Sequence, residues 1–246
     1  MRLGMGHTHH LSCEARLHGC GFRIPPRLRA SAINGHDHRM KFGVAAVATV
    51  ALAFVLLWLR ERRARTVFPA SQAASLMNPL RRYIQPPDRM VAEFGIAGGD
   101  TVLELGPGPG YFTVEAARAA GAGGRIICID LQPDMVRELM RRLPDDLAPR
   151  VRLVIADAMH LPLSDAAVDR AFAVAVLGEV PQPPRALAEL RRVVRAGGTV
   201  SIAETLTDPD YIRQGTLREM GWEVGLSFVV RHRGRLGYIM RFTRPA

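Results

Sequence analysis

Three glycines alternate with other residues directly after an acidic residue that ends an apolar stretch. Residues 102–113 read VLELGPGPGYFT, with Glu104 before the glycines. Glycine lets the backbone come close to a ligand and adopt dihedral angles that other residues avoid, and the start of a following helix offers free N–H groups. At the carboxyl end of a parallel strand, this arrangement predicts a site for a nucleotide-containing cofactor.

The spacing of the glycines separates two kinds of nucleotide cofactor. A dinucleotide fingerprint requires G-x-G-x-x-G. Counting from Gly106 puts Tyr111 where the third glycine belongs, and counting from Gly108 puts Thr113 there. The pattern is instead E-x-G-x-G-x-G, which weighs against a nicotinamide dinucleotide.

Two more carboxylates follow the next two apolar stretches. Asp130 follows Arg125–Ile129, where a carboxylate can accept hydrogen bonds from both hydroxyls of a ribose, and Asp157 follows Val151–Ile155. Each also has a simpler interpretation, because Asp is a common N-cap of helices and a common turn residue. Together with the glycines, they favour a nucleotide site.

The glycine pattern resembles the first motif of class I S-adenosylmethionine (SAM) methyltransferases, and the resemblance covers about residues 78–243. It includes residues 168–181 and the segment VRAGGT at 194–199. The chain looks like the small-molecule branch (methyltransferase type 11) that includes ubiquinone- and menaquinone-biosynthesis enzymes. The resemblance implies an enzyme that uses SAM as its cofactor and methylates a small-molecule acceptor.

The resemblance also implies roles for the glycine loop. Gly106, Gly108 and Gly110 would cradle the methionine part of SAM, and Glu104 would anchor the loop and the amino end. The whole implied cofactor-binding set is Glu104, Gly106, Pro107, Gly108, Gly110, Tyr111, Asp130, Leu131, Asp157, Ala158 and Leu177.

Further along the chain, the implied roles concern the nucleoside and the sulfonium. Asp130 would hold the ribose and Leu131 would cover one face of the adenine. Asp157 and Ala158 would read the adenine edge, and Leu177 would line the pocket near the sulfonium.

The sequence contains no Ser-His-Asp or Cys-His set that would indicate a nucleophile, and it predicts no metal site. In-line methyl transfer can rely on alignment and exclusion of water instead. Glu179 lies near the expected transfer site and is the only catalytic candidate, although a solvated loop carboxylate explains it equally well. Leu177–Val180 stands where adenine and glutamine N-methyltransferases carry Asn/Asp-Pro-Pro-aromatic, so the resemblance does not extend to that chemistry.

Alternating apolar stretches and helical patterns must position these residues. The expected strands are 101–105, 125–129, 151–155, 168–177 and 199–203. The expected helices are 111–120, 132–143, one from about 184, and 208–220 with Gly221 as its stop. Residues 223–230 and 236–243 are typical of an antiparallel hairpin. Near-continuous apolar strands predict an α/β fold, a doubly wound and mostly parallel seven-stranded sheet.

The N-terminal third predicts a membrane anchor over residues 40–65. Phe42–Leu59 holds eighteen residues without a charge, and as a helix it would be roughly 27 Å long, close to the thickness of a bilayer core. Four arginines follow within residues 60–65, where a cleaved signal peptide would carry small residues. We expect a linker over 66–77 and the methyltransferase domain over 78–246, on the cytoplasmic side.

Residues 1–39 predict a disordered lead or an over-extended start, because Met40 directly precedes the apolar run. The true start, Met1 or Met40, stays open, and with it the membrane topology. Cys13 and Cys20 lie in this lead and Cys128 in an apolar stretch, so no disulfide framework is predicted.

The charge distribution argues against nucleic acid as a partner. The chain of 246 residues carries a net charge of +10, and residues 1–82 alone hold 13 Lys and Arg against 3 Asp and Glu. The remainder is electrically neutral, so the excess belongs to the anchor and its flanks. Two alternatives to the methyltransferase remain, an NAD(P)-dependent oxidoreductase and a non-catalytic, membrane-tethered SAM-binding adaptor. The oligomeric state stays open.

Overall fold

The computed structural model describes residues 49–50, 52–53 and 67–246. The first two stretches are helical and belong to one compact unit, and residues 67–246 belong to a second. Apart from those four residues, the predicted span over 42–59 lies outside the described residues, as does the lead over 1–39. Within the described stretches, no helix is both long and apolar enough to cross a bilayer.

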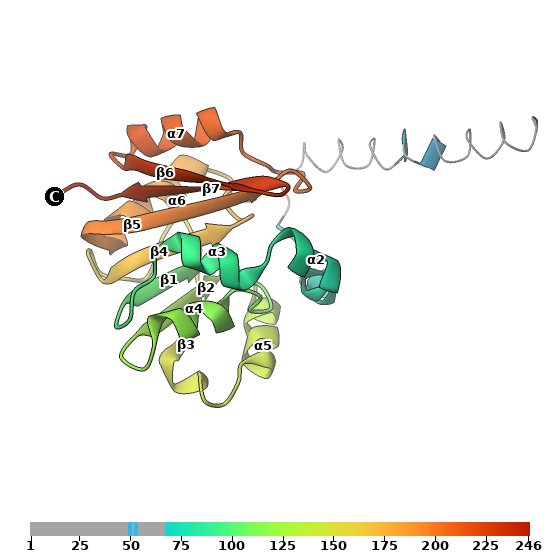
Figure 1. Ribbon diagram of the computed structural model, residues 1–246, viewed down its shortest axis with the longest axis horizontal. Coiled ribbons are helices and arrows are strands. Elements are labelled where there is room, and N and C mark those ends of the chain that lie inside the picture. The colour runs from blue at the N-terminus through green and yellow to red at the C-terminus, as the bar shows by residue number, and fades with distance from the viewer. Residues whose placement is uncertain (1–48, 51, 54–66) are drawn as a thin grey trace, which may run out of the picture. The chain divides into compact units, whose positions relative to one another are not determined.

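The second unit is built on one seven-stranded sheet (Figure 1). Its strands are β1 (Thr101–Leu105), β2 (Arg125–Asp130), β3 (Val151–Ile155), β4 (Val168–Val174), β5 (Val194–Thr205), β6 (Ser227–Gly234) and β7 (Gly237–Thr243). They lie in the order β3-β2-β1-β4-β5-β7-β6. The first five pair in parallel and β7 is antiparallel to both of its neighbours. This confirms the predicted doubly wound sheet with a C-terminal hairpin.

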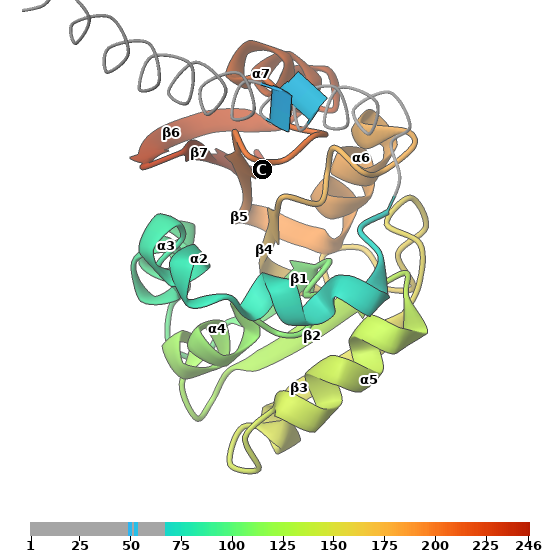
Figure 2. The ribbon, with the colours of Figure 1, turned by 90° about the vertical axis from the view of Figure 1, so that its right-hand side faces the viewer.

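Helices cover both faces of the sheet (Figures 1 and 2). They are the 3₁₀ helices η1 (Ala70–Met77) and η2 (Ala148–Arg150), and α2 (Pro79–Ile84), α3 (Pro87–Phe94), α4 (Thr113–Ala120), α5 (Pro133–Arg142), α6 (Pro183–Val193) and α7 (Gln214–Glu223). One core packs α3, α4 and α5 against the sheet, and the other packs α6 and α7 against the opposite face. Successive strand residues enter opposite cores, as the pleat of a strand requires.

The last helix differs from its predicted range of 208–220. Asp208 begins a turn instead, because its Oδ1 accepts a hydrogen bond from the backbone N–H of Asp210 at 2.8 Å. The helix then starts at Gln214 and continues past Gly221 to Glu223. Gly221 does not stop the helix. A Cβ there would lie 2.7 Å from the ring of Phe242, so glycine allows the helix to pack on the sheet.

The fourth strand also ends earlier than predicted. β4 stops at Val174, and Ala175 has a φ of +53°, a left-handed conformation that turns the chain away from the sheet. The segments that follow β4 and β5 are therefore loops at the same edge of the sheet. Both loops help to form the site described next.

Candidate functional site

A cavity of about 820 Å³ opens at the carboxyl ends of the parallel strands. This volume lies within the roughly 300–1,000 Å³ typical of small-molecule sites. Nine residues predicted for the site line this cavity: Gly106, Pro107, Gly108, Tyr111, Asp130, Leu131, Asp157, Ala158 and Glu179. Residues from four separate stretches of the sequence are thus brought to one place.

The glycine loop forms a tight turn between β1 and α4. Gly106 and Gly108 have φ values of +65° and +55°, which residues with a Cβ rarely adopt. A Cβ on Gly106 would collide with both methyl groups of Val176, in the loop after β4. The backbone N–H of Gly106 donates to the carbonyl of Ile129 at 2.8 Å, which fixes the turn against the end of β2.

Asp130 connects the glycine loop to the start of α5. Its Oδ2 accepts from the N–H of Gly108 at 3.2 Å and its Oδ1 from the N–H of Gln132 at 2.9 Å. Burial raises the pKa of this carboxyl, and these backbone N–H groups oppose that shift. Because a carboxylate offers about four acceptor positions, Asp130 can still accept from the hydroxyls of a ribose.

Asp157 lies at the opposite wall, after β3. Its Oδ1 accepts from the N–H of Met159 at 2.8 Å, so it closes a turn as the simpler interpretation predicts. Asp157 and Ala158 nevertheless line the cavity, and the Oδ2 of Asp157 lies 3.8 Å from Nδ1 of His160. The turn and the proposed contact with adenine are therefore compatible.

Glu104 lies behind the cavity wall rather than in it. Only 2% of the residue is exposed, and its Oε2 accepts a hydrogen bond from Oγ1 of Thr113 at 2.6 Å. Burial raises the pKa of Glu104 to about 7. This bond joins β1 to the first turn of α4, on either side of the glycine loop. That Glu104 anchors the loop and contacts the amino end of SAM stays a prediction.

Gly110 and Leu177 also lie outside the cavity lining. A Cβ on Gly110 would collide with Leu139 of α5, so glycine at this position permits close packing of the loop on the helix. Leu177 is fully buried in the core that contains α6 and α7. Direct contact of these two residues with SAM stays a prediction.

One part of the cavity lining is acidic, and we term it the acidic end. Glu179, Asp208 and Asp210 line it, and Glu204 at the end of β5 lies close behind. Burial, with a smaller contribution from the neighbouring carboxylates, raises the pKa of Glu179 to about 7 and that of Asp208 to about 6. Groups that titrate near neutral pH are typical of sites where protons are transferred.

The segment Val67–Leu76, termed the strap here, forms another wall of the cavity. Gln132 binds it twice, since Oε1 accepts from the N–H of Ala70 at 3.2 Å and Nε2 donates to the carbonyl of Phe68 at 2.8 Å. In Figure 2, η1 crosses in front of the carboxyl ends of β1 and β2. The predicted linker over 66–77 is thus part of the site, although its small, polar residues carry no signal of this.

Arg81 is a further lining residue that the sequence does not single out. Its guanidinium lies 4.4 Å from the ring centroid of Tyr111, donates from Nε to Oε1 of Gln85 at 2.8 Å, and donates to the carbonyl of Leu76 at 3.0 Å. Tyr111 in turn donates from its hydroxyl to the carbonyl of Gln85 at 3.1 Å. These contacts attach α2 and the end of η1 to the glycine loop.

Comparison with known proteins agrees with this geometry. Residues 103–202 match the family model described as a methyltransferase domain. The chain is 34% identical over 143 residues to a demethylmenaquinone methyltransferase of Thermobifida fusca (57% of this chain, 58% of that protein). It is 30% identical over 137 residues to an arsenite methyltransferase of Halobacterium salinarum (54% of this chain, 35% of that protein).

Among solved structures, a SAM-dependent methyltransferase from Aquifex aeolicus superimposes with a TM-score of 0.68 at 21% identity. The superposition covers 72% of this chain and 100% of the Aquifex aeolicus chain, so the two share a fold. The chain spans 30% of the length of one curated relative and 58% of another. The comparisons thus find a methyltransferase domain over residues 103–202 and, over 72% of the chain, the fold of a SAM-dependent methyltransferase. They give no support to the alternative of a nicotinamide-dependent oxidoreductase.

Proposed function

We propose that this methyltransferase transfers the methyl group of SAM to a small, lipid-associated acceptor while residues 42–59 anchor it in a membrane. In this proposal the described domain lies on the cytoplasmic side. The observation that carries the transfer is the single cavity itself. It holds the glycine loop, Asp130 and Asp157 together with the carboxylates around Glu179.

The residues around the cavity fit SAM. The left-handed turn at Gly106 leaves no space for a side chain and brings backbone close to the ligand, and Asp130 keeps free acceptor positions for a ribose. SAM would supply an activated methyl group. The chain's own residues would bind and align the two reactants, which is where much of the rate enhancement of such displacements arises.

Glu179 is the residue best placed to accept a proton from the acceptor. It lines the same cavity as Asp130, at the acidic end, and its pKa of about 7 matches the task of a base at neutral pH. The strap covers this end, because Phe68 donates its N–H to Oε2 of Glu179. Covering by the strap would keep water away from the reacting atoms.

A lipid-associated acceptor is supported by two independent features. Apolar residues, including Leu76, Leu80, Ile84 and Val180, line the cavity beside the acidic end. Several similar proteins, including the one from Thermobifida fusca, are named demethylmenaquinone methyltransferases. The uncharged run at 42–59 would hold the enzyme where such molecules dissolve.

Calorimetric titration of the full chain in detergent with SAM, its demethylated product and NAD tests the cofactor. We expect SAM and its product to bind and NAD not to bind. Asp130→Asn is expected to weaken SAM by at least about tenfold, because an amide offers the ribose fewer acceptors. Asp134→Asn, at an exposed position on α5, is the matched control. Binding of NAD without SAM would overturn the proposal.

Incubation of the enzyme with a membrane extract and isotopically labelled SAM tests the transfer. A labelled lipid or quinone supports the proposed acceptor class. SAM binding without any labelled product would favour the non-catalytic adaptor instead. Recovery of the native protein in the membrane fraction after a high-salt wash tests the anchor, and release into the supernatant would contradict it.

A further inference from the structure

Four exposed apolar side chains form one surface beside the cavity, which we term the apolar rim: Leu80, Tyr83, Leu206 and Leu236. The exposed fractions of these residues are 63%, 65%, 55% and 39%. Leu80 and Tyr83 belong to α2, Leu206 follows β5, and Leu236 lies in the turn between β6 and β7. Figure 1 shows α2 and the tip of this hairpin at the same end of the unit.

Contacts between these elements join the parts of the apolar rim. The guanidinium of Arg235 lies 3.7 Å from the ring centroid of Tyr83, which links the hairpin tip to α2. The N–H of Leu206 donates to the carbonyl of Leu236 at 2.8 Å, which links the hairpin tip to the loop after β5. The four side chains therefore belong to one continuous part of the surface.

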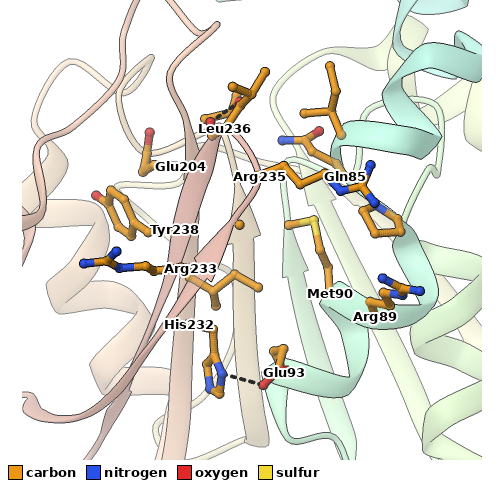
Figure 3. Close-up of a pocket in the computed structure, with 16 residues that line it drawn as sticks. Gln85, Arg89, Met90, Glu93, Glu204, His232, Arg233, Arg235, Leu236 and Tyr238 are labelled. Atoms are coloured by element: carbon orange, nitrogen blue, oxygen red, sulfur yellow. Dashed lines mark hydrogen bonds and ion pairs between the residues drawn. The ribbon is translucent and has the colours of Figure 1, made fainter. Parts of the chain in front are cut away.

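The apolar rim borders the entrance to the site. Leu80 lines the large cavity, and Leu236 lines a second cavity of about 230 Å³ between α3 and the hairpin. Figure 3 shows Arg235 extending from the hairpin tip toward Gln85 across this second cavity. Ile84, Gln85 and Thr205 line both cavities, so the two lie side by side beneath the rim.

The charges around the apolar rim are mainly positive. Arg82, Arg89, Arg233 and Arg235 are all exposed residues on α2, α3 and the hairpin. The acidic Glu93 near them is paired with His232 at 2.7 Å. Exposed Leu and Tyr flanked by arginines is the composition that anionic lipid headgroups attract, because each cation near such a surface adds favourable electrostatic energy.

The length of chain before the strap keeps the cavity near the proposed anchor. Val67 lines the cavity, and only residues 60–66 separate it from the end of the apolar run at Leu59. Fully extended, that connection spans at most about 30 Å at roughly 3.6 Å per residue. A domain so tethered always has its cavity entrance within reach of the headgroups.

We propose that the apolar rim docks on the anionic surface of the membrane, so that a lipid-soluble acceptor enters the cavity directly from the bilayer. The proposal rests on the proposed function, and it adds the face of the domain that contacts lipid. Docking places Leu80, Tyr83, Leu206 and Leu236 at headgroup depth and the surrounding arginines beside lipid phosphates.

Fluorescence quenching of the full chain tests the docking. Leu80→Cys, Leu236→Cys and Met140→Cys are each made in a chain with Cys13 and Cys20 replaced by Ser, since Cys128 is buried and will not be labelled. The labelled proteins are reconstituted in phosphatidylcholine–phosphatidylglycerol vesicles that carry a headgroup nitroxide. Met140, 61% exposed on α5, matches Leu80 in exposure and is the control.

We expect strong quenching at positions 80 and 236 and little at position 140. Arg235→Gln is expected to lower the ratio of docked to undocked molecules by about fivefold, the effect of one cation at an anionic surface. Arg137→Gln on α5 is expected to leave this ratio unchanged. Equal quenching at all three positions, or failure of the chain to float with the vesicles, would overturn the proposal.

A second copy of the chain is the other candidate to cover the rim. Weak quenching at positions 80 and 236 that rises only when vesicles hold one molecule each would show that a second copy shields these residues from the headgroup nitroxide, and would also overturn the proposal. Calorimetric titration of the same variants with SAM keeps the two ideas separate. Variants that bind SAM but do not dock contradict only the docking, whereas a chain that fails to bind SAM contradicts the proposed function.

Discussion

The backbone N–H of Phe68 donates a hydrogen bond to Oε2 of Glu179 at 3.1 Å, across 111 residues of sequence. One partner opens the strap and the other follows β4 at the acidic end of the cavity. Burial raises the pKa of Glu179 to about 7, and the N–H of Phe68 opposes that shift. The position of the strap and the protonation of the candidate base are therefore linked.

Replacing Glu179 with Gln tests its role as a base. We expect the methyl-transfer rate to fall by about 10²–10⁴-fold, the usual contribution of a positioned general base. The affinity for SAM is expected to change far less than the rate, because a base acts on the acceptor in the proposed transfer. The wild-type rate is expected to rise with pH through about 7, as the carboxyl loses its proton.

Transfer of label from SAM to the membrane extract, measured between pH 5 and 9, gives both results. The Glu179→Gln variant is expected to lose the rise near pH 7 as well as the rate. An unchanged pH profile in this variant would assign the rise to another group. A normal rate would show that Glu179 is only a loop carboxylate, the simpler interpretation of the sequence.

The central strands could be predicted because burial on both faces makes them nearly continuous apolar stretches, whereas the edge strand β3 is only partly buried. β1 and β3 have their predicted bounds, since Thr101–Leu105 and Val151–Ile155 are set off clearly from the sequence around them. The start of α7 could not be predicted in this way. A side-chain hydrogen bond within the Asp208–Asp210 turn competes with the helix, and such local competition is invisible in apolar periodicity.

The site was predictable where its contacts are local. Gly108 follows β1 and Asp130 ends β2, so parallel pairing of these strands brings them together without further information. The strap was not predictable, because the bonds of Phe68 and Ala70 to Glu179 and Gln132 join distant segments with no periodic pattern. The acidic end likewise depends on where two irregular loops meet.

Gly106→Ala is expected to impair both stability and SAM binding. The φ of +65° is strained for alanine, and its methyl group would collide with Val176. We expect a loss of about 1–3 kcal/mol in the free energy of unfolding and at least about tenfold in SAM affinity. Denaturant titration and calorimetry measure the two quantities.

Gly215→Ala in α7 is the matched control, because a Cβ there meets nothing within 4 Å and the backbone is helical. This variant is expected to be at least as stable as the wild type. Adding Val176→Ala to Gly106→Ala should restore part of the stability by removing the collision. Full restoration would show that the left-handed turn is not needed.

Gln132→Ala is expected to release the strap. The variant loses the hydrogen bonds to Ala70 and Phe68 that hold η1 across the cavity. We expect faster amide hydrogen exchange in residues 68–76, and about a tenfold weaker affinity for SAM because the cavity then spends more time open. Exchange measured by mass spectrometry, with and without SAM, follows the strap directly.

Arg137→Ala on the exposed face of α5 is the control for that helix. It is expected to change neither the exchange of residues 68–76 nor the affinity. If Gln132→Ala leaves exchange of the strap unchanged, then other contacts hold this segment and Gln132 is not its main attachment.

Glu204→Gln is expected to stabilise the domain at high pH. Glu204 is 3% exposed, its Oε1 has no hydrogen-bond partner in the described part of the chain, and burial raises its pKa from 4.5 to about 8. Folding therefore favours the protonated acid. Its contribution to stability is complete below pH 4.5, where the unfolded chain is also protonated, and is lost as pH rises through about 8.

The free energy of unfolding, followed by denaturant titration between pH 5 and 9, measures this effect. We expect this carboxyl to add a downward slope of up to about 1.4 kcal/mol per pH unit, the value for one proton released on unfolding. Glutamine keeps the shape but does not titrate, so Glu204→Gln is expected to flatten that slope. Glu219→Gln, at an exposed position on α7, should leave it unchanged. Parallel slopes in the wild type and Glu204→Gln would assign the pH dependence to Glu179 and Asp208, its acidic neighbours.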